Sequence, residues 1–169
     1  TCEYKDVFPI EKTSIAPLLI ASFDIECTSG DGSFPNASRK SDEIIQIGTT
    51  FHKYGSKDCH IKHIVTLKKC KKFEEDPNVI VESYLTEREV LIAWAKLIEK
   101  TDPDIITGYN IWGFDFSYIY DRARCLFDGE RGDYSALLLD ILARNKAKTP
   151  RFIEKKLSSA ALGDNFLKY

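Results

Sequence analysis

The stretch Ser22-Phe23-Asp24-Ile25-Glu26-Cys27 sets the fold of this chain. It follows the apolar residues 17–21 and precedes a loop rich in serine and glycine, which is the pattern of a buried strand. Side chains alternate between the two faces of a strand, so Asp24 and Glu26 point to one face and Ile25 to the other. Two adjacent carboxylates at the end of a buried strand repel each other and lose hydration unless a cation lies between them.

This pair of acids has two interpretations. One is a divalent-metal site built on Asp24 and Glu26. The other is a strand that reaches the surface early and exposes two hydrated acids, because acids are common at strand ends in open α/β sheets. The stretch by itself favours neither.

The composition is that of a globular domain. The chain has 169 residues and carries 24 basic and 26 acidic side chains, for a formal net charge of −2. Its length suffices for one domain with a full core. We find no apolar run near the length of a membrane span and no signal-peptide pattern. The near-neutral net charge argues against a nucleic-acid-binding protein that relies on overall basic charge. It does not argue against one that binds phosphate through metal ions.

The cysteines and the start of the chain give two further expectations. The five cysteines are odd in number and form no C-x-x-C pair, which argues against a zinc site and a disulfide framework and favours an intracellular, reducing compartment. The sequence has no methionine, even at position 1, so we expect a piece of a longer polypeptide. We interpret residues 1–15 as a lead-in or linker and residues 16–169 as a partial domain.

A hairpin is expected after the first strand. Residues 44–51 and 60–67 are β-branched and apolar, and residues 54–58 between them have the composition of a turn. The three histidines lie in or beside this hairpin and are expected on the strand surface without a catalytic role; they are His52, His60 and His63. Phe34, in the preceding loop, is either a lid on the local core or a ligand contact.

A helix and a crossover strand follow. Thr86-Glu87-Arg88-Glu89 is a capping box, and Trp94 belongs to the apolar face of the helix that it starts. This helix is expected to end before Pro103. Residues 104–108 then form a short buried strand, which makes an α/β crossover.

The next loop carries a third acid. Tyr109-Asn110-Ile111-Trp112-Gly113-Phe114-Asp115-Phe116 connects this strand to a second helix. Asp115 either caps that helix or converges on Asp24 and Glu26, because loops at strand ends are where α/β sheets place their sites. Residues 129–133, which contain two glycines, are expected to break the second helix. A third helix is expected from Tyr134 to about Arg144, followed by an irregular basic tail.

Two of these stretches together resemble a known family. Phe23-Asp24-Ile25-Glu26 and Tyr109-Asn110-x-x-x-Phe114-Asp115 resemble the first and second exonuclease motifs of family B DNA polymerases. Residues 101–111 are very similar to the corresponding stretch of delta-type members. The loop and the tail are most similar to members from large DNA viruses. The resemblance covers nearly the whole chain from about Ala16.

The resemblance implies a ribonuclease-H-like α/β fold, with a mixed sheet of three antiparallel strands plus parallel additions, flanked by helices. It implies a 3′→5′ proofreading exonuclease that uses two Mg²⁺ or Mn²⁺ ions. Its expected partners are the frayed, single-stranded 3′ end of a DNA primer and the polymerase domains of the same chain, in the nucleus or at a viral replication site and without a membrane. By motif position and aromatic character, the catalytic and metal-binding residues are Asp24, Glu26 and Asp115, and the nucleic-acid contacts are Phe34, Asn110 and Phe116.

The chemistry agrees with these residue types. Two-metal hydrolysis of a phosphodiester requires an activated water and neutralisation of the leaving oxygen. Hard cations take oxygen ligands, hence carboxylates. Asp24 is the candidate bridging ligand, Glu26 the ligand of the ion that generates hydroxide, and Asp115 the ligand that completes the second ion.

The sequence departs from the family in one respect. The third exonuclease motif, Tyr-x-x-x-Asp, is matched in spacing only by Tyr54-x-x-x-Asp58, which precedes the second motif and lies in the expected hairpin turn. We therefore expect the sequence to stop short of the third motif and the isolated chain to be weakly active or inactive. The alternatives are a free-standing ribonuclease-H-like exonuclease and a non-catalytic module that binds single-stranded nucleic acid.

Overall fold

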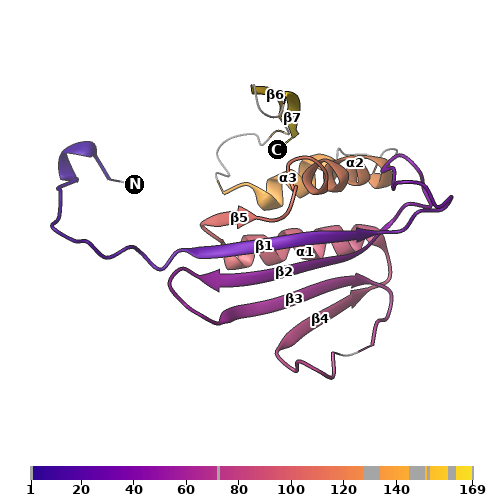
Figure 1. Ribbon diagram of the computed structural model, residues 1–169, viewed down its shortest axis with the longest axis horizontal. Helices are drawn as coiled ribbons and strands as arrows, with labels where there is room; N and C mark the ends of the chain where they lie inside the picture. Colours follow the sequence, from indigo (N-terminus) through magenta and orange to yellow (C-terminus); the bar gives the residue numbers. More distant parts are fainter. Residues whose placement is uncertain are drawn as a thin grey trace.

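The computed structural model describes residues 2–71, 73–127, 134–144, 151, 153–159 and 163–168. Its centre is a five-stranded sheet with the order β4-β3-β2-β1-β5 (Figure 1). The strands are β1 (Leu19–Cys27), β2 (Ile44–Lys53), β3 (Cys59–Leu67), β4 (Val79–Tyr84) and β5 (Ile105–Thr107). β1, β2 and β3 are antiparallel, whereas β4 runs parallel to β3 and β5 parallel to β1. The expected ribonuclease-H-like mixed sheet is confirmed.

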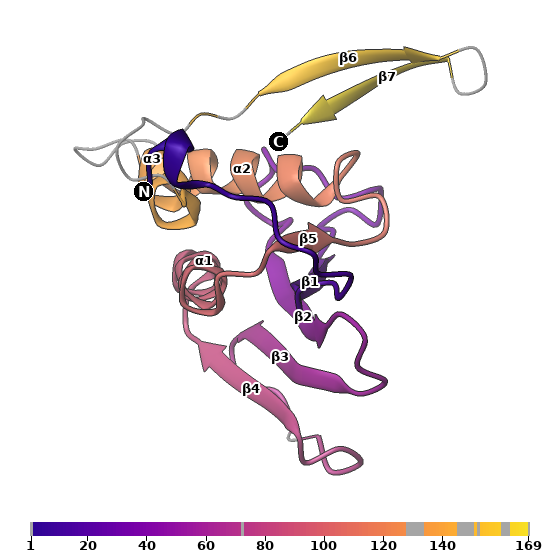
Figure 2. The same cartoon turned by 90° about the vertical axis from the view of Figure 1, so that its left-hand side faces the viewer.

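Among the described residues, three α-helices accompany the sheet: α1 (Glu87–Thr101), α2 (Asp115–Phe127) and α3 (Tyr134–Leu142). α1 lies against one face of the sheet, and α2 and α3 lie beyond β5 (Figure 2). A short 3-10 helix, η1 (Tyr4–Asp6), lies in an N-terminal arm that leads into β1. In the described part of the chain, no helix combines the length and apolar character needed to cross a membrane.

Trp94 of α1 is the central side chain of the core. It is fully buried, and its ring lies 4.9 Å from that of Phe23 on β1. Its indole N–H donates to Thr49 Oγ1 of β2 over 3.2 Å, so burial leaves this polar group satisfied. The expected core role of Trp94 is confirmed.

The ends of α1 follow from local sequence. Thr86 accepts from the N–H of Glu89, whose side chain accepts from the N–H of Thr86, so the capping box is formed as expected. At the other end Asp102 adopts a left-handed conformation with φ of 44°, and Pro103 follows. A proline at this point prevents the helix from continuing.

Some sequence expectations were wrong. The tail beyond residue 146 is not wholly irregular, because β6 (Glu154–Ser159) and β7 (Gly163–Lys168) form an antiparallel hairpin. These segments contain no β-branched residue, so they lack the usual strand signal. β4 was not expected, although Val79-Ile80-Val81 carries that signal.

Two burial expectations also need correction. His63 is not a surface residue: it is buried, and its Nε2 lies 3.5 Å from Glu82 Oε1 on the neighbouring strand β4. β5 is not a buried strand, because Ile105 and Thr107 are exposed at the edge of the sheet. The expected helix break at residues 129–133 lies outside the described residues.

The turn after β5 packs tightly on β1. A Cβ atom on Gly108 would lie 2.5 Å from the carbonyl oxygen of Phe23 and 2.4 Å from Cγ2 of Ile111. Glycine is therefore required here for the close approach of two backbone segments.

The Gly108→Ala substitution is expected to lower the free energy of unfolding by about 1–3 kcal/mol, because a backbone oxygen cannot move aside for the added methyl group. Gly48→Ala is the matched control, since a Cβ at Gly48 would meet no atom within 4 Å. Urea denaturation followed by circular dichroism measures both. Equal effects of the two substitutions would contradict the close-approach argument.

Candidate active site

Strand β1 presents its two acids on the face opposite α1. Phe23 and Ile25 are buried, whereas Asp24 and Glu26 are exposed. The expected alternation is therefore confirmed. In this arrangement the two carboxylates are available to solvent and to a ligand.

Asp115 reaches the same strand from the side. β5 pairs with β1 only as far as Ser22 and Thr107, so β1 continues beyond its parallel neighbour. The N–H of Ile25 donates instead to Asp115 Oδ1 over 3.1 Å. Asp115 is the first residue of α2 and is only 3% exposed. It thus supplies a buried acceptor to a backbone group that the sheet leaves unpaired.

The charge of Asp115 is disfavoured in this position. Burial raises the pKa of its carboxyl, the N–H of Ile25 opposes that shift, and the negative charge of Asp24 raises the pKa further. The repulsion between Asp24 and Asp115 is the physical situation in which a cation between two acids is favourable.

A pocket of about 330 Å³ joins these groups. Besides the three carboxylates it is lined by Phe34 and Asn110, so it brings together five of the six residues proposed from the sequence. The sixth, Phe116, is half-buried and packs on Phe23 and Trp112 with ring centroids 5.1 Å apart in both cases, and it does not line the pocket. The other lining residues are Ile25, Cys27, Pro35, Tyr109 and Phe114.

The loop before α2 is shaped by Asn110. This residue has a positive φ of 53°, and its carbonyl oxygen accepts the N–H groups of Gly113 at 2.9 Å and Phe114 at 3.1 Å. The resulting turn directs the chain from the edge of the sheet into α2. It thereby sets where Asp115 lies.

The three carboxylates do not close around a common point. Among the described residues, no three His, Cys, Asp or Glu side chains are grouped closely enough to hold a metal ion. Asp115 is bonded to the backbone of β1, while Asp24 and Glu26 face solvent. Their all-oxygen donor set nevertheless suits Mg²⁺ or Mn²⁺, and the repulsion described above favours such an ion.

A second, larger hollow extends the site along the open face of the sheet. It has a volume of about 740 Å³ and shares Asp24 and Tyr109 with the first pocket. Tyr109 is 91% exposed and therefore lies free at the boundary of the two hollows. Lys62 and Phe73 also line the larger hollow, and the Lys62 ammonium is paired with Asp76 over 2.6 Å.

Sequence reasoning did not single out the residues that support the site. Arg122 and Glu87 form a buried ion pair between α2 and α1, and Asp42 is fully enclosed in the loop before β2. For Arg122 the available signal was a basic residue beside Ile119 and Ala123 on the apolar face of a helix.

Comparison with known proteins identifies the relatives of the chain. The model of the DNA polymerase family B exonuclease domain matches residues 1–161. The DNA polymerase of Acanthamoeba polyphaga mimivirus is 50% identical over 120 residues, which cover 70% of this chain and 7% of the relative. The DNA polymerase of Pyramimonas orientalis virus is 46% identical over 130 residues, covering 77% and 10%. The DNA polymerase delta catalytic subunit of Arabidopsis thaliana is 42% identical over 129 residues, covering 74% and 11%. The matched part of the chain thus spans between 7% and 11% of these relatives.

The Asp115→Asn substitution is expected to stabilise the fold at neutral pH, because asparagine keeps an acceptor for Ile25 and removes a disfavoured charge. The pKa of Asp115 is higher in the folded than in the unfolded chain, so the cost of its charge is present at neutral pH. That cost falls as pH decreases through the folded pKa, and it is gone below the ordinary value of 3.8.

Urea denaturation of both proteins between pH 3 and pH 8 measures this difference, with Asp58→Asn in the exposed hairpin turn as the control. If Asp115→Asn raised the free energy of unfolding by the same amount at every pH, the charge of Asp115 would not be the cause of the difference. Addition of Mn²⁺ at neutral pH is expected to stabilise the unsubstituted chain more than Asp115→Asn, because a cation relieves the same repulsion.

Proposed function

The chain belongs to the exonuclease domain family of family B DNA polymerases, and on that premise we propose that it forms the 3′→5′ proofreading exonuclease region of a DNA-directed DNA polymerase. The observation that carries the proposal is the convergence of Asp24, Glu26 and Asp115 on one pocket from β1 and α2. The substrate is the frayed, single-stranded 3′ end of a DNA primer. The partners are the polymerase domains of the same protein, in the nucleus or at a viral replication site.

Asp24, Glu26 and Asp115 are the residues that would hold the divalent ions. Two such ions, when bound, supply an activated water and neutralise charge on the leaving oxygen. Asp24 lines both hollows and would be the ligand shared by the two ions. Glu26, exposed on the same face of β1, would bind the first ion, and Asp115 would bind the second.

Two exposed aromatic rings fit the proposed substrate. Phe34 is 76% exposed and Tyr109 is 91% exposed, and both line the pocket that holds the carboxylates. Exposed rings beside a charged site bind single strands because every base offers a face for stacking. An unpaired terminal base stacked on Phe34 lies within the same pocket as the acids, whereas a paired base remains in the duplex.

A second candidate function is binding of single-stranded nucleic acid without hydrolysis. It is favoured by the open arrangement of the carboxylates, which are not grouped to hold a metal among the described residues. Divalent ions distinguish the two functions. Hydrolysis depends on added Mg²⁺ or Mn²⁺, whereas stacking on Phe34 and Tyr109 does not.

The double substitution Asp24→Ala and Glu26→Ala, made in the polymerase that contains this chain, tests the proposal. Digestion of a mismatched 3′ end is expected to fall by on the order of 10²-fold or more, because the groups that stabilise charge in the transition state are lost. Primer extension on a matched end is expected to continue at the original rate. Gel analysis of a labelled primer measures both activities.

The matched control is the double substitution Asp6→Ala and Glu11→Ala, which removes two exposed acids from the N-terminal arm. Digestion by this control is expected to remain unchanged. Undiminished digestion after loss of Asp24 and Glu26 would refute the assignment. Absence of metal-dependent digestion in the unsubstituted polymerase, with single-strand binding retained, would favour the binding function.

A further inference from the structure

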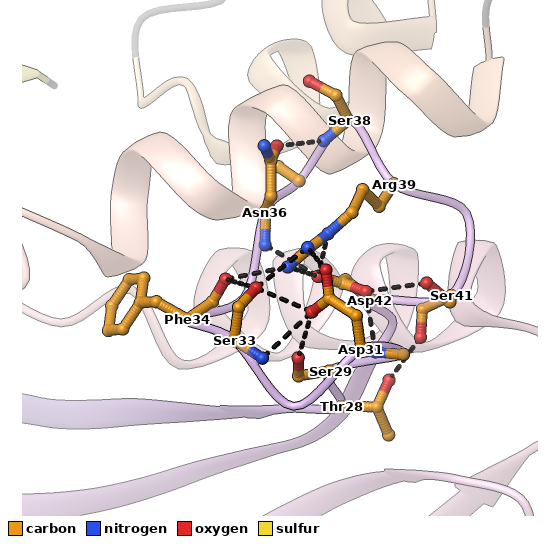
Figure 3. Close-up of polar contacts among 12 residues, drawn as sticks. Thr28, Ser29, Asp31, Ser33, Phe34, Asn36, Ser38, Arg39, Ser41 and Asp42 are labelled. Carbon is orange, nitrogen blue, oxygen red and sulfur yellow. Dashed lines mark hydrogen bonds and ion pairs between the residues drawn. The ribbon is translucent and has the colours of Figure 1, made fainter.

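The loop of residues 28–43 is built around a buried carboxylate (Figure 3). Asp42 is fully enclosed, and its carboxylate accepts the N–H of Asn36 at 2.8 Å, the N–H of Gly30 at 3.0 Å and the hydroxyl of Ser41 at 2.8 Å. Burial by itself would raise the pKa of Asp42, but these hydrogen bonds outweigh it and hold the pKa well below its ordinary value. Asp42 is therefore charged, and it draws both halves of the loop together.

Arg39 connects this centre to the backbone of Phe34. Its Nε donates to Asp42 Oδ2 over 2.8 Å, and its Nη2 donates to the carbonyl oxygen of Phe34 over 2.8 Å. Its Nη1 donates to Ser33 Oγ over 2.9 Å and also pairs with Asp31 (Figure 3). One guanidinium thus holds the segment before Phe34, the Phe34 carbonyl and the buried acid.

Helix α2 holds the same loop from the other side. The hydroxyl of Tyr118 donates to the carbonyl oxygen of Asp42 over 2.9 Å. Nη1 of Arg122 donates to the carbonyl oxygens of Ala37 at 2.9 Å and Arg39 at 2.8 Å. These two side chains share a helix face with Asp115, at helical spacings of three and seven residues. A single helix face therefore positions both the metal-ligand candidate and the loop.

The Phe34 ring itself is only slightly buried. It is 76% exposed and meets the edge of the Phe114 ring at a centroid distance of 5.2 Å. An exposed ring on a loop ordinarily becomes ordered only when its ligand binds, and this ordering costs conformational entropy. Here the polar contacts fix the backbone of Phe34 beforehand, and the Phe114 ring lies beside the Phe34 ring, so less conformational entropy is lost when a base stacks on it.

We propose that Arg39 is a positioning residue that acts through Phe34: together with Asp42 and α2 it preforms an aromatic platform on which the unpaired 3′-terminal base of a single strand stacks. This inference rests on the proposed exonuclease function and adds the residue that holds Phe34 in position for the terminal base. The recognised group is the base of the terminal nucleotide, not its phosphate, because Phe34 offers a π-face and no charge. Arg39 itself contacts no substrate.

The alternative is that this network only stabilises the fold. The two roles differ in their dependence on the terminal base. If Arg39 positions Phe34, its loss lowers activity on a 3′ end that carries a base and leaves activity on an abasic 3′ end unchanged. A purely structural role lowers activity on both ends alike.

The experiment compares Arg39→Ala, Phe34→Ala and the double substitution in the polymerase that contains this chain, on single-stranded oligonucleotides with a normal or an abasic 3′ terminus. Arg39→Ala is expected to raise KM for the normal terminus about 5-fold or more, which corresponds to ~1 kcal/mol of lost stacking, and to leave kcat unchanged. The double substitution is expected to match Phe34→Ala alone, because Arg39 acts through Phe34. Arg144→Ala, which removes an exposed arginine paired with Asp102, is the control and is expected to have no effect.

The positioning role would be overturned if the increases in KM caused by Arg39→Ala and Phe34→Ala multiplied in the double substitution. Equal increases in KM for normal and abasic termini would also overturn it. Hydrogen exchange gives a second measurement that does not depend on nuclease activity. The amides of residues 28–43 are expected to exchange faster in Arg39→Ala while those of α1 keep their protection, and unchanged exchange in the loop would also overturn it.

Tyr118→Phe provides a second variant should Arg39→Ala fail to fold, since it removes one hydroxyl bond to the loop. It is expected to raise KM for the normal terminus selectively, though less than Arg39→Ala, and an equal effect on the abasic terminus would overturn the proposal. A failure of the exonuclease assignment is recognised separately, because digestion would then survive the loss of Asp24 and Glu26.

Discussion

The buried ion pair between Glu87 and Arg122 is the interaction on which the arrangement of the site depends. Glu87 opens α1 and also accepts the N–H of Ile44 at the start of β2 over 2.8 Å. Arg122 donates its Nε to Glu87 over 2.8 Å and its Nη1 to two carbonyl oxygens of the loop before β2. Burying two charges is costly unless their hydrogen bonds are satisfied, and loss of one partner costs about 3–5 kcal/mol. The pair therefore holds α2 in place against α1, β2 and the loop.

That placement determines the chemistry at β1. With α2 fixed, its first residue, Asp115, meets the N–H of Ile25 just where β5 has ended. The close approach of Gly108 to Phe23 holds the turn between β5 and α2 against the same strand. The burial of Phe23 under α1 in turn leaves Asp24 facing outward. Three acids from two elements thus line one pocket, and this arrangement and membership of the family together support the proposed exonuclease function.

Local patterns in the sequence predicted much of this structure. Alternation in β1, the hairpin of β2 and β3, and the capping box of α1 each depend on neighbouring residues. Five of the six proposed site residues line one pocket, because strand ends and the following loop are brought together by the crossover. Phe116 packs into the aromatic core instead, since it lies four residues after Trp112 and faces Phe23. The partners of Arg122 come from distant segments, so no local pattern identifies them. The Asp42 carboxylate binds groups of its own irregular loop, which carries no periodic pattern. A divalent-metal site was one of the two interpretations of Asp24 and Glu26 alone, whereas the number of ions and the DNA substrate were suggested only by resemblance to the family.

The most direct test of the account is the position of a bound ion. Anomalous X-ray diffraction from crystals of the chain soaked in Mn²⁺ locates such an ion without reference to activity. A peak is expected in the pocket, with carboxylate oxygens of Asp24 and of Glu26 or Asp115 about 2.1 Å away. A soaked crystal with Mn²⁺ bound elsewhere and none at these three carboxylates, with Asp115 still bonded to Ile25, would contradict it.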